Sequence, residues 1–271
     1  MTVWLNTSFL LKFRVIDGLT VRFAQSEDPD DHALLLSPWP ESLFAFEQMW
    51  ARLAEHTHLV AIDLPGLGHS QRRDALLTPR AMAEFLVRAA DAFGLKHPHV
   101  IAPDVGTAAA LFAAAAHPVR FRSLVVGGGL SYQGNRFAES MRYLRSYPSE
   151  LPALAGLLPQ VQTPVQIIAG AHDPVIPLAN AAFLAQRLPH NKLDVIDAGH
   201  FTWEDAADDY AALVTSWWDG GYAATGAAQP TDHGPQQCRG HPDAVIHGDV
   251  DDNRDTLGVT EQPHGRKSSA S

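Results

Sequence analysis

Between residues 32 and 218 the chain alternates short apolar segments with stretches whose apolar residues recur at helical spacing. Turn residues bound the apolar segments, which predicts buried strands, and the stretches between them predict helices. Strands that alternate with helices predict an α/β protein with a mostly parallel sheet and helices on both faces. The strand segments are HALLLS, HLVAIDLPG, HVIAPDVG, FRSLVVGGG, TPVQIIAGAHDP and NKLDVIDAGH. The helical segments are SLFAFEQMWARLAE, TPRAMAEFLVRAADAFGL, the Ala-rich stretch after Asp104, NAAFLAQRLP and WEDAADDYAALVTSWW.

Local signals mark the ends of several elements. Two strand candidates, Leu11–Ile16 and Thr20–Ala24, are joined through Asp17-Gly18, a dipeptide that favours a tight hairpin turn. Thr78 followed by proline predicts a helix N-cap and first helical residue, and Gly94 is typical of a helix end. These signals predict an antiparallel hairpin ahead of the parallel part of the sheet.

Composition limits the class of protein. The chain has 271 residues, one cysteine and a formal net charge of -10 at pH 7. A lone cysteine excludes an internal disulfide and fits a reducing compartment, and the negative charge disfavours nucleic-acid binding, which needs a basic surface. The first residues do not resemble a signal peptide, and no apolar run is long enough to cross a bilayer. We therefore expect a soluble, cytoplasmic protein that acts on a small molecule and has no membrane partner. The sequence leaves its oligomeric state open.

The composition changes at Gly220. Residues 220–271 are rich in Gly, Pro, Asp, His and Gln, and have few large apolar residues. Such a segment buries too little surface to offset the entropy lost on ordering. We therefore expect one folded domain over residues 1–219 and a disordered tail over residues 220–271. The histidines of the tail are irregularly spaced, which does not match a metal site.

Three polar residues follow predicted strands, where ligands of α/β sheets bind. Asp104 follows HVIAP, Asp173 follows VQIIAGAH and His200 follows LDVIDAG. An aspartate before a helix commonly acts only as an N-cap, and an aspartate in a loop only as a turn residue. The order of acid, acid and histidine along the chain, each after a predicted strand, favours a catalytic group instead.

Residues 13–218 resemble the α/β-hydrolase family, whose triad has the order nucleophile, acid, histidine. The segments DLPGLGHS, IAGAHDPVIP and DAGHFTWED resemble the loop after its fourth strand, its acid loop and its histidine segment. SPWPES, residues 37–42, stands where the family has His-Gly-x-Pro. The elbow APDVG carries Asp104 where most members carry serine, which resembles the subgroup of epoxide hydrolases and haloalkane or haloacetate dehalogenases. Residues 1–219 would then be the hydrolase domain.

The resemblance implies a covalent mechanism. Asp104 attacks an sp³ carbon and forms an ester, His200 activates the water that hydrolyses it, and Asp173 orients the imidazole. The intermediate needs an oxyanion hole, for which the backbone N–H groups of Val105 and Trp39 are the candidates, because the prolines that flank Trp39 have none. No metal or organic cofactor is implied, since a carboxylate, an imidazole and water suffice.

The segment Ser131–Thr163 stands where the resembling enzymes insert a cap of several helices. Because it is short, we expect one final cap helix and a connector, which leave the site open to water. RFAESMRYLRSYP predicts a helix on which Tyr143 and Tyr147 share a face. Cap tyrosines protonate the epoxide oxygen in epoxide hydrolases, and these two are the candidates. The alternative is that both only pack the helix on the core.

We expect hydrolysis of epoxides to diols. Val105 stands where haloalkane dehalogenases have a halide-binding tryptophan, which disfavours haloalkanes, although Trp39 offers an indole N–H. The alternatives are a dehalogenase that acts on haloalkanes or haloacids, and a catalytically weak or ligand-binding homologue. Ser70 lies in a loop without the strand-to-helix context of a nucleophile, so we do not expect it to serve as one.

Overall fold

The computed structural model describes residues 10–26, 32–129 and 142–225. All of them belong to one compact unit. Helical chain continues through α9 (Tyr222–Ala224), beyond the boundary at Gly220 that the composition predicts. The rest of the predicted tail, residues 226–271, lies outside the described residues, and so do residues 131–141 of the predicted cap. The described ranges contain no helix that is long and apolar enough to cross a membrane.

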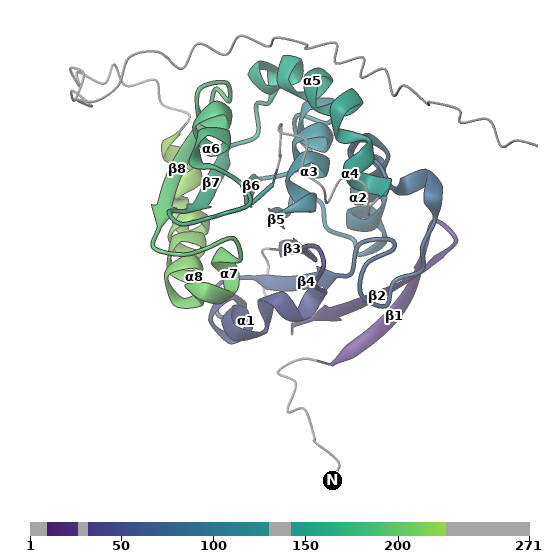
Figure 1. Cartoon of the computed structure of the whole chain (residues 1–271). Coiled ribbons are helices and arrows are strands. Elements are labelled where there is room, and N and C mark those ends of the chain that lie inside the picture. The colour runs from purple at the N-terminus through teal and green to yellow at the C-terminus, as the bar shows by residue number, and fades with distance from the viewer. Residues whose placement is uncertain (1–9, 27–31, 130–141, 226–271) are drawn as a thin grey trace, which may run out of the picture. The chain divides into compact units, whose positions relative to one another are not determined.

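Eight strands form one sheet in the order β1-β2-β4-β3-β5-β6-β7-β8 (Figure 1). β2 pairs antiparallel with β1 and β4, whereas all neighbouring strands from β4 to β8 are parallel. The predicted α/β-hydrolase architecture, with its mostly parallel sheet, is confirmed. The strands are β1 (Leu11–Ile16), β2 (Leu19–Gln25), β3 (His32–Leu36), β4 (His58–Ile62), β5 (His99–Pro103), β6 (Ser123–Gly127), β7 (Val165–Gly170) and β8 (Asn191–Ile196).

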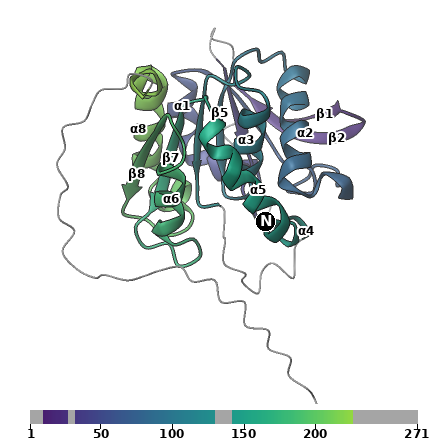
Figure 2. The same cartoon turned by 90° about the horizontal axis from the view of Figure 1, so that it is seen from above.

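Helices cover both faces of the sheet (Figure 2). Residues of α2 (Pro79–Ala92), α3 (Val105–Ala116), α5 (Tyr147–Leu157) and α6 (Leu178–Ala185) share one hydrophobic core with one face. Residues of η1 (Leu43–Phe46), α1 (Glu47–Ala54) and α8 (Ala207–Ser216) form the core on the other. The shorter elements are η2 (Asp74–Leu76), α4 (Arg142–Arg145), η4 (Leu158–Gln160), α7 (Thr202–Asp205) and η5 (Trp217–Gly221).

The Ala-rich helix α3 begins directly after Asp104. All of its residues from Val105 to Ala114 are buried, with α2, α5 and the sheet packed around it. Alanine has the highest helix propensity and almost no side-chain bulk, so neighbouring elements can approach the helix closely. The position of the residue that precedes α3 is therefore fixed by dense packing.

The buried carboxylate of Asp63 joins β2, the start of η1 and the loop after β4. Asp63, after β4, accepts hydrogen bonds from Arg22 Nε at 2.6 Å, from the N–H of Leu43 at 2.8 Å and from the N–H of His69 at 2.8 Å. Ser70 Oγ donates to the Asp63 carbonyl at 2.7 Å and accepts the Arg22 N–H at 2.9 Å. The hydroxyl of Ser70 is thus engaged in holding this loop.

Candidate active site

Asp104 occupies the turn between β5 and α3. Its φ of 49° and ψ of -122° lie in a region that residues with side chains rarely adopt. Its N–H donates to the Gly127 carbonyl at 2.8 Å, and Thr107 Oγ1 donates to the Ala102 carbonyl at 2.9 Å. These bonds tie the turn to β5, β6 and the first turn of α3. The side chain of Asp104 makes no helix-capping hydrogen bond, so the N-cap alternative is wrong.

Gly129 lets the chain after β6 approach this turn. A Cβ at Gly129 would collide with the Asp104 carbonyl oxygen and would lie 2.8 Å from Thr107 Cβ. The sequence marks residues 127–129 only as the end of a strand. Their part in accommodating the turn follows from the tertiary structure alone.

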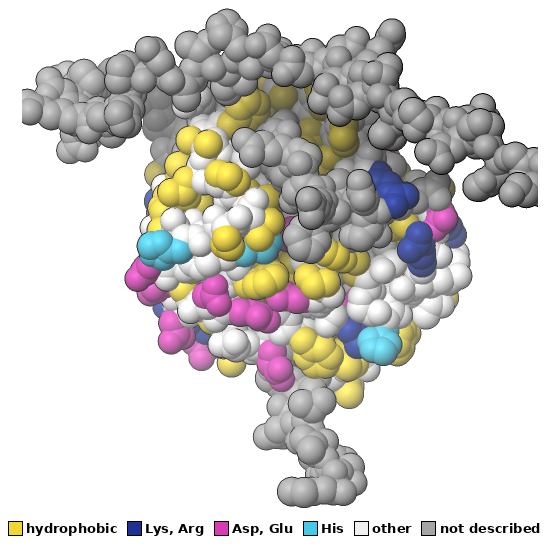
Figure 3. Space-filling model, in the orientation of Figure 1, with side chains coloured by type: hydrophobic (Ala, Val, Ile, Leu, Met, Phe, Trp, Pro, Cys, Tyr) yellow, Lys and Arg dark blue, Asp and Glu magenta, His cyan; other side chains and the backbone are white. Residues whose placement is uncertain are grey.

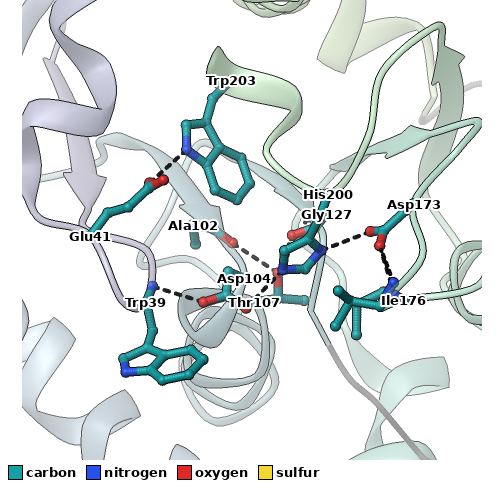
Figure 4. A network of polar contacts seen from close by, with 11 residues as sticks. Trp39, Glu41, Ala102, Asp104, Thr107, Gly127, Asp173, Ile176, His200 and Trp203 are labelled. Carbon is teal, nitrogen blue, oxygen red and sulfur yellow. Dashed lines mark hydrogen bonds and ion pairs between the residues drawn. The ribbon is translucent and has the colours of Figure 1, made fainter. Parts of the chain in front are cut away.

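His200 lies between the two predicted acids (Figure 4). Its Nδ1 is 2.8 Å from Asp173 Oδ2, and its Nε2 is 4.0 Å from Asp104 Oδ1. Asp173 Oδ1 accepts the N–H groups of Val175 and Ile176 at 2.7 and 2.8 Å. The backbone therefore orients Asp173, and Asp173 orients the imidazole so that Nε2 faces Asp104. The structure brings the three predicted residues together.

The two carboxylate oxygens of Asp104 have different surroundings. Oδ2 accepts the N–H of Trp39 at 2.8 Å, whereas Oδ1 faces His200. The N–H of Val105 also interacts with the carboxylate. Both backbone groups that the sequence predicts as oxyanion donors thus lie at the Asp104 side chain. Such donors stabilise negative charge that develops on an oxygen at their position.

Burial and charge shift the pKa of each member of this group. Burial raises the pKa of Asp104 to about 6, against the N–H groups of Trp39 and Val105 and the charge of His200. Burial also acts to raise the pKa of Asp173, but the hydrogen bond from His200 and two backbone N–H groups outweigh it, so this pKa is lowered. The pKa of His200 is raised because Asp173 and Asp104 outweigh the effect of burial.

Glu41 is a further ionisable group of the site that the sequence reasoning missed. It lies between β3 and η1, and its Oε2 accepts Trp203 Nε1–H at 2.9 Å (Figure 4). Burial raises the pKa of Glu41 to about 7, against the bond from Trp203, and the charges of Glu204 and Asp104 add to the rise while His200 opposes it. The one available signal was its place in SPWPES, the segment that supplies a predicted oxyanion donor.

The two candidate cap tyrosines lie close to Asp104 but differ in their contacts. Tyr143 is in α4 and Tyr147 begins α5, so the predicted single helix is divided at Ser146. Their rings are in edge contact, with centroids 5.8 Å apart, and burial and the charge of Asp104 raise the pKa of both. Tyr143 OH donates to the Val105 carbonyl at 2.9 Å. Within the described part of the chain, no hydrogen bond engages the hydroxyl of Tyr147.

The chain between Tyr147 and Thr163 contains α5 and η4. The sequence predicts one cap helix and a connector for the whole segment Ser131–Thr163, so the described part is more helical than predicted. Prolines at 148, 152 and 159 favour a loop in the sequence. Pro148 stands in the first turn of α5, where the missing N–H has no partner to lose.

Across residues 10–26, 32–129 and 142–225, no group of three His, Cys, Asp or Glu side chains is arranged to hold a metal ion.

A family model described as alpha/beta hydrolase fold matches residues 34–152. The magnesium-chelatase 30 kDa subunit of Rhodobacter capsulatus is 39% identical over 71 residues, 26% of this chain. The match spans about a quarter of that relative's length. The putative carbamate hydrolase RutD of Caulobacter sp. (strain K31) is 26% identical over 263 residues, which cover 76% of this chain and 97% of that protein.

Solved structures share the fold at low sequence identity. One is the 2-hydroxy-6-oxo-6-phenylhexa-2,4-dienoate hydrolase of Rhodococcus sp. strain RHA1, with a TM-score of 0.66 and 16% identity. The superposition covers 78% of this chain and 99% of that chain. At this identity the likeness establishes the arrangement of elements and leaves the reaction to be argued from the site.

Proposed function

This chain has the α/β-hydrolase fold, and we propose that it is a hydrolase in which Asp104 forms a covalent ester with its substrate. The comparisons support a hydrolase of the α/β-hydrolase kind. The observation that carries the covalent step is the placement of the Asp104 carboxylate. Its Oδ2 accepts the N–H of Trp39, and its Oδ1 faces Nε2 of His200. The other ring nitrogen of His200, Nδ1, is bound by Asp173.

The proposed substrate is an epoxide. In the first step Asp104 Oδ1 attacks an epoxide carbon, a C–O ester bond forms, and the C–O bond of the ring breaks. The ring oxygen takes a proton from an acid, for which Tyr147 is the better candidate, because Tyr143 already donates to a backbone carbonyl. The leaving oxygen becomes a hydroxyl, and the substrate remains attached to the enzyme.

In the second step water hydrolyses the ester. His200 Nε2 takes a proton from water, and the resulting hydroxide attacks Cγ of Asp104. The oxyanion that forms occupies the position of Oδ2, beside the N–H of Trp39. The N–H of Val105, which also interacts with this carboxyl group, is the second donor. The intermediate collapses, and the diol oxygen leaves with the proton from His200. The carboxylic acid formed on Asp104 then releases its proton to solvent, which restores the carboxylate, and Tyr147 takes back from solvent the proton that it gave to the ring oxygen. Asp173 stabilises the imidazolium throughout.

The charges around the site disfavour an anionic substrate such as a haloacid. Asp104, Asp173 and Glu41 contribute acidic groups inside the site. Figure 3 shows acidic side chains gathered on one face of the molecule. The exposed acids of α7 and α8 are Glu204, Asp205, Asp208 and Asp209. A carboxylate substrate would be repelled by these groups, whereas a neutral epoxide would not.

The decisive experiment traps the ester. The variant His200→Gln lacks the base for the second step, so incubation with an epoxide panel at pH 8 should raise the intact mass by one substrate. In the parent the pKa of Asp104 is about 6, so pH 8 leaves room for the rise in this pKa that loss of the His200 charge causes. The same incubation with Asp104→Asn is the matched control and should add no mass.

The other outcomes discriminate between functions. Adduct formation from haloalkanes with release of halide, and none from epoxides, would replace the epoxide by a carbon–halogen substrate. Absence of any adduct and of any diol, with a melting temperature that substrates still raise, would favour a ligand-binding protein. An adduct on Asp104→Asn would exclude Asp104 as the nucleophile.

A further inference from the structure

Trp203 connects the catalytic histidine to Glu41 (Figure 4). Its side chain is fully buried, and its ring lies edge-on to the His200 ring, with centroids 6.5 Å apart. Its Nε1–H donates to Glu41 Oε2 at 2.9 Å. A buried indole N–H needs an acceptor, so Trp203 holds the Glu41 carboxylate in a fixed position, from which its charge acts on His200.

The loop that carries Glu41 is itself held on both sides. Trp39, two residues earlier, donates its N–H to Asp104, and Leu43, two residues later, donates its N–H to buried Asp63. Glu41 thus lies in a short segment with both flanks hydrogen-bonded, and Figure 4 shows it on the opposite side of His200 from Asp173. This arrangement leaves the carboxylate little freedom to move away.

We propose that Glu41, oriented by Trp203, is a positioning residue that stabilises the imidazolium form of His200 while the ester on Asp104 is hydrolysed. The inference rests on the proposed covalent mechanism. His200 becomes a cation when it takes the proton of water, and a carboxylate near it in a partly buried site lowers the energy of that cation.

Esterification of Asp104 changes which acids support the imidazolium. Asp173, Asp104 and Glu41 are the acids that act to raise the pKa of His200 against its burial. Once Asp104 is esterified it carries no charge, so the imidazolium loses one of the three. Asp173 and Glu41 then remain as the anions that support it. Glu41 therefore acts at the step in which the nucleophile can no longer help.

Ester formation also changes the charge of Glu41. In the free enzyme the pKa of Glu41 is about 7, and the charge of Asp104 contributes to that rise. Loss of the Asp104 charge on esterification lowers the pKa of Glu41 and favours its ionised form. Glu204, on α7, is the other acid that acts on Glu41, and His200 opposes both. The loss of negative charge at Asp104 is thus partly offset by a larger ionised fraction of Glu41.

The test measures the pKa of His200 directly, by NMR titration of the imidazole, so that it does not depend on turnover. The His200 signal is the one that His200→Gln removes. Asp104→Asn provides the background, because a neutral Asn stands in for the esterified side chain. Glu41→Gln removes the charge but keeps an oxygen that accepts Trp203 Nε1–H. We expect Glu41→Gln to lower the pKa of His200, both alone and in the Asp104→Asn background.

Two variants serve as controls. Glu204→Gln removes an exposed acid next to Trp203 and should not lower the pKa of His200. Trp203→Phe keeps a ring beside His200 but frees Glu41; it should lower the pKa of His200 in the parent and not in Glu41→Gln. An unchanged titration in Glu41→Gln, or an equal decrease in Glu204→Gln, would overturn the proposal. Failure to form any ester would instead refute the covalent mechanism and leave the titration result standing.

Discussion

Asp104 combines two unfavourable features in one residue. Its backbone, at φ 49° and ψ -122°, costs about 1–3 kcal/mol relative to an ordinary conformation. Its side chain is 13% exposed, and burial raises its pKa to about 6. The contacts of Gly127 and Thr107 hold the turn in place. Strain of this kind is typical of functional sites, where surrounding packing outweighs it.

Removal of the Asp104 charge should stabilise the fold. Because the folded-state pKa is raised, the ionised carboxylate destabilises the native state above about pH 6, and this effect disappears below the unfolded value of 3.8. Asn tolerates positive φ. We expect Asp104→Asn to raise the free energy of unfolding by about 1–3 kcal/mol at pH 8 and to match the parent near pH 4. Urea unfolding at both pH values measures this, and a less stable variant at pH 8 would contradict it.

The pH dependence of ester formation should follow the same carboxylate. Only ionised Asp104 is a nucleophile, so the rate of ester formation should rise with pH through about 6. The charge of His200 lowers the pKa of Asp104, and its loss in His200→Gln should move this limb to higher pH. Rapid-mixing measurements of adduct formation provide the profiles. If the rate of ester formation rises over the same pH range in His200→Gln as in the parent, the charge of His200 does not lower the pKa of Asp104.

At the scale of elements, α4 and α5 place two tyrosines at the site in different states. Tyr143 OH donates to the carbonyl of Val105 in the first turn of α3, and this bond joins α4 to α3. Tyr147, at the start of α5, has its ring against Tyr143. The division between the two helices therefore separates a packing residue from a candidate proton donor.

Paired substitutions distinguish these roles. Tyr147→Phe should slow ester formation about 10²-fold or more, because the leaving oxygen loses its acid. Tyr143→Phe should lower the free energy of unfolding by about 1 kcal/mol, the contribution of one buried hydrogen bond, with a smaller effect on the rate. Adduct kinetics and thermal unfolding of both variants measure the difference. The assignment fails if Tyr143→Phe slows ester formation more than Tyr147→Phe does.

At the scale of the whole molecule, the pair of Asp63 and Arg22 joins the antiparallel and parallel parts of the sheet. Both side chains are buried, and Nε lies 2.6 Å from Oδ2. Asp63→Ala would leave a buried cation without a partner and should lower the free energy of unfolding by about 3–5 kcal/mol. The exposed pair Arg72–Asp74 is the control, since Asp74→Ala should cost less than about 1 kcal/mol. Similar losses in chemical denaturation of both variants would refute this assignment.

Recognition from sequence succeeded where the signal is local. The central strands β3, β4 and β5 are continuous apolar runs, and Asp104, Asp173 and His200 lie within four residues of the ends of β5, β7 and β8, so topology alone predicts that they share one edge of the sheet. The predicted helix over 203–218 is instead α7 and α8, because Ala206 has φ -137° and ψ 50°. No apolar pattern reports such a break, since the spacing of buried residues is nearly the same on both sides of it.

The sequence by itself determined the α/β architecture and the order of the polar residues along it, because strand and helix periods and turn residues are properties of neighbouring positions. Only the tertiary structure decided the 4.0 Å approach of His200 to Asp104, the separate surroundings of the two Asp104 oxygens and the entry of Glu41 into the site. These depend on contacts such as that of Trp203 with Glu41, 162 positions apart. Pairings over such distances leave no periodic trace in one chain.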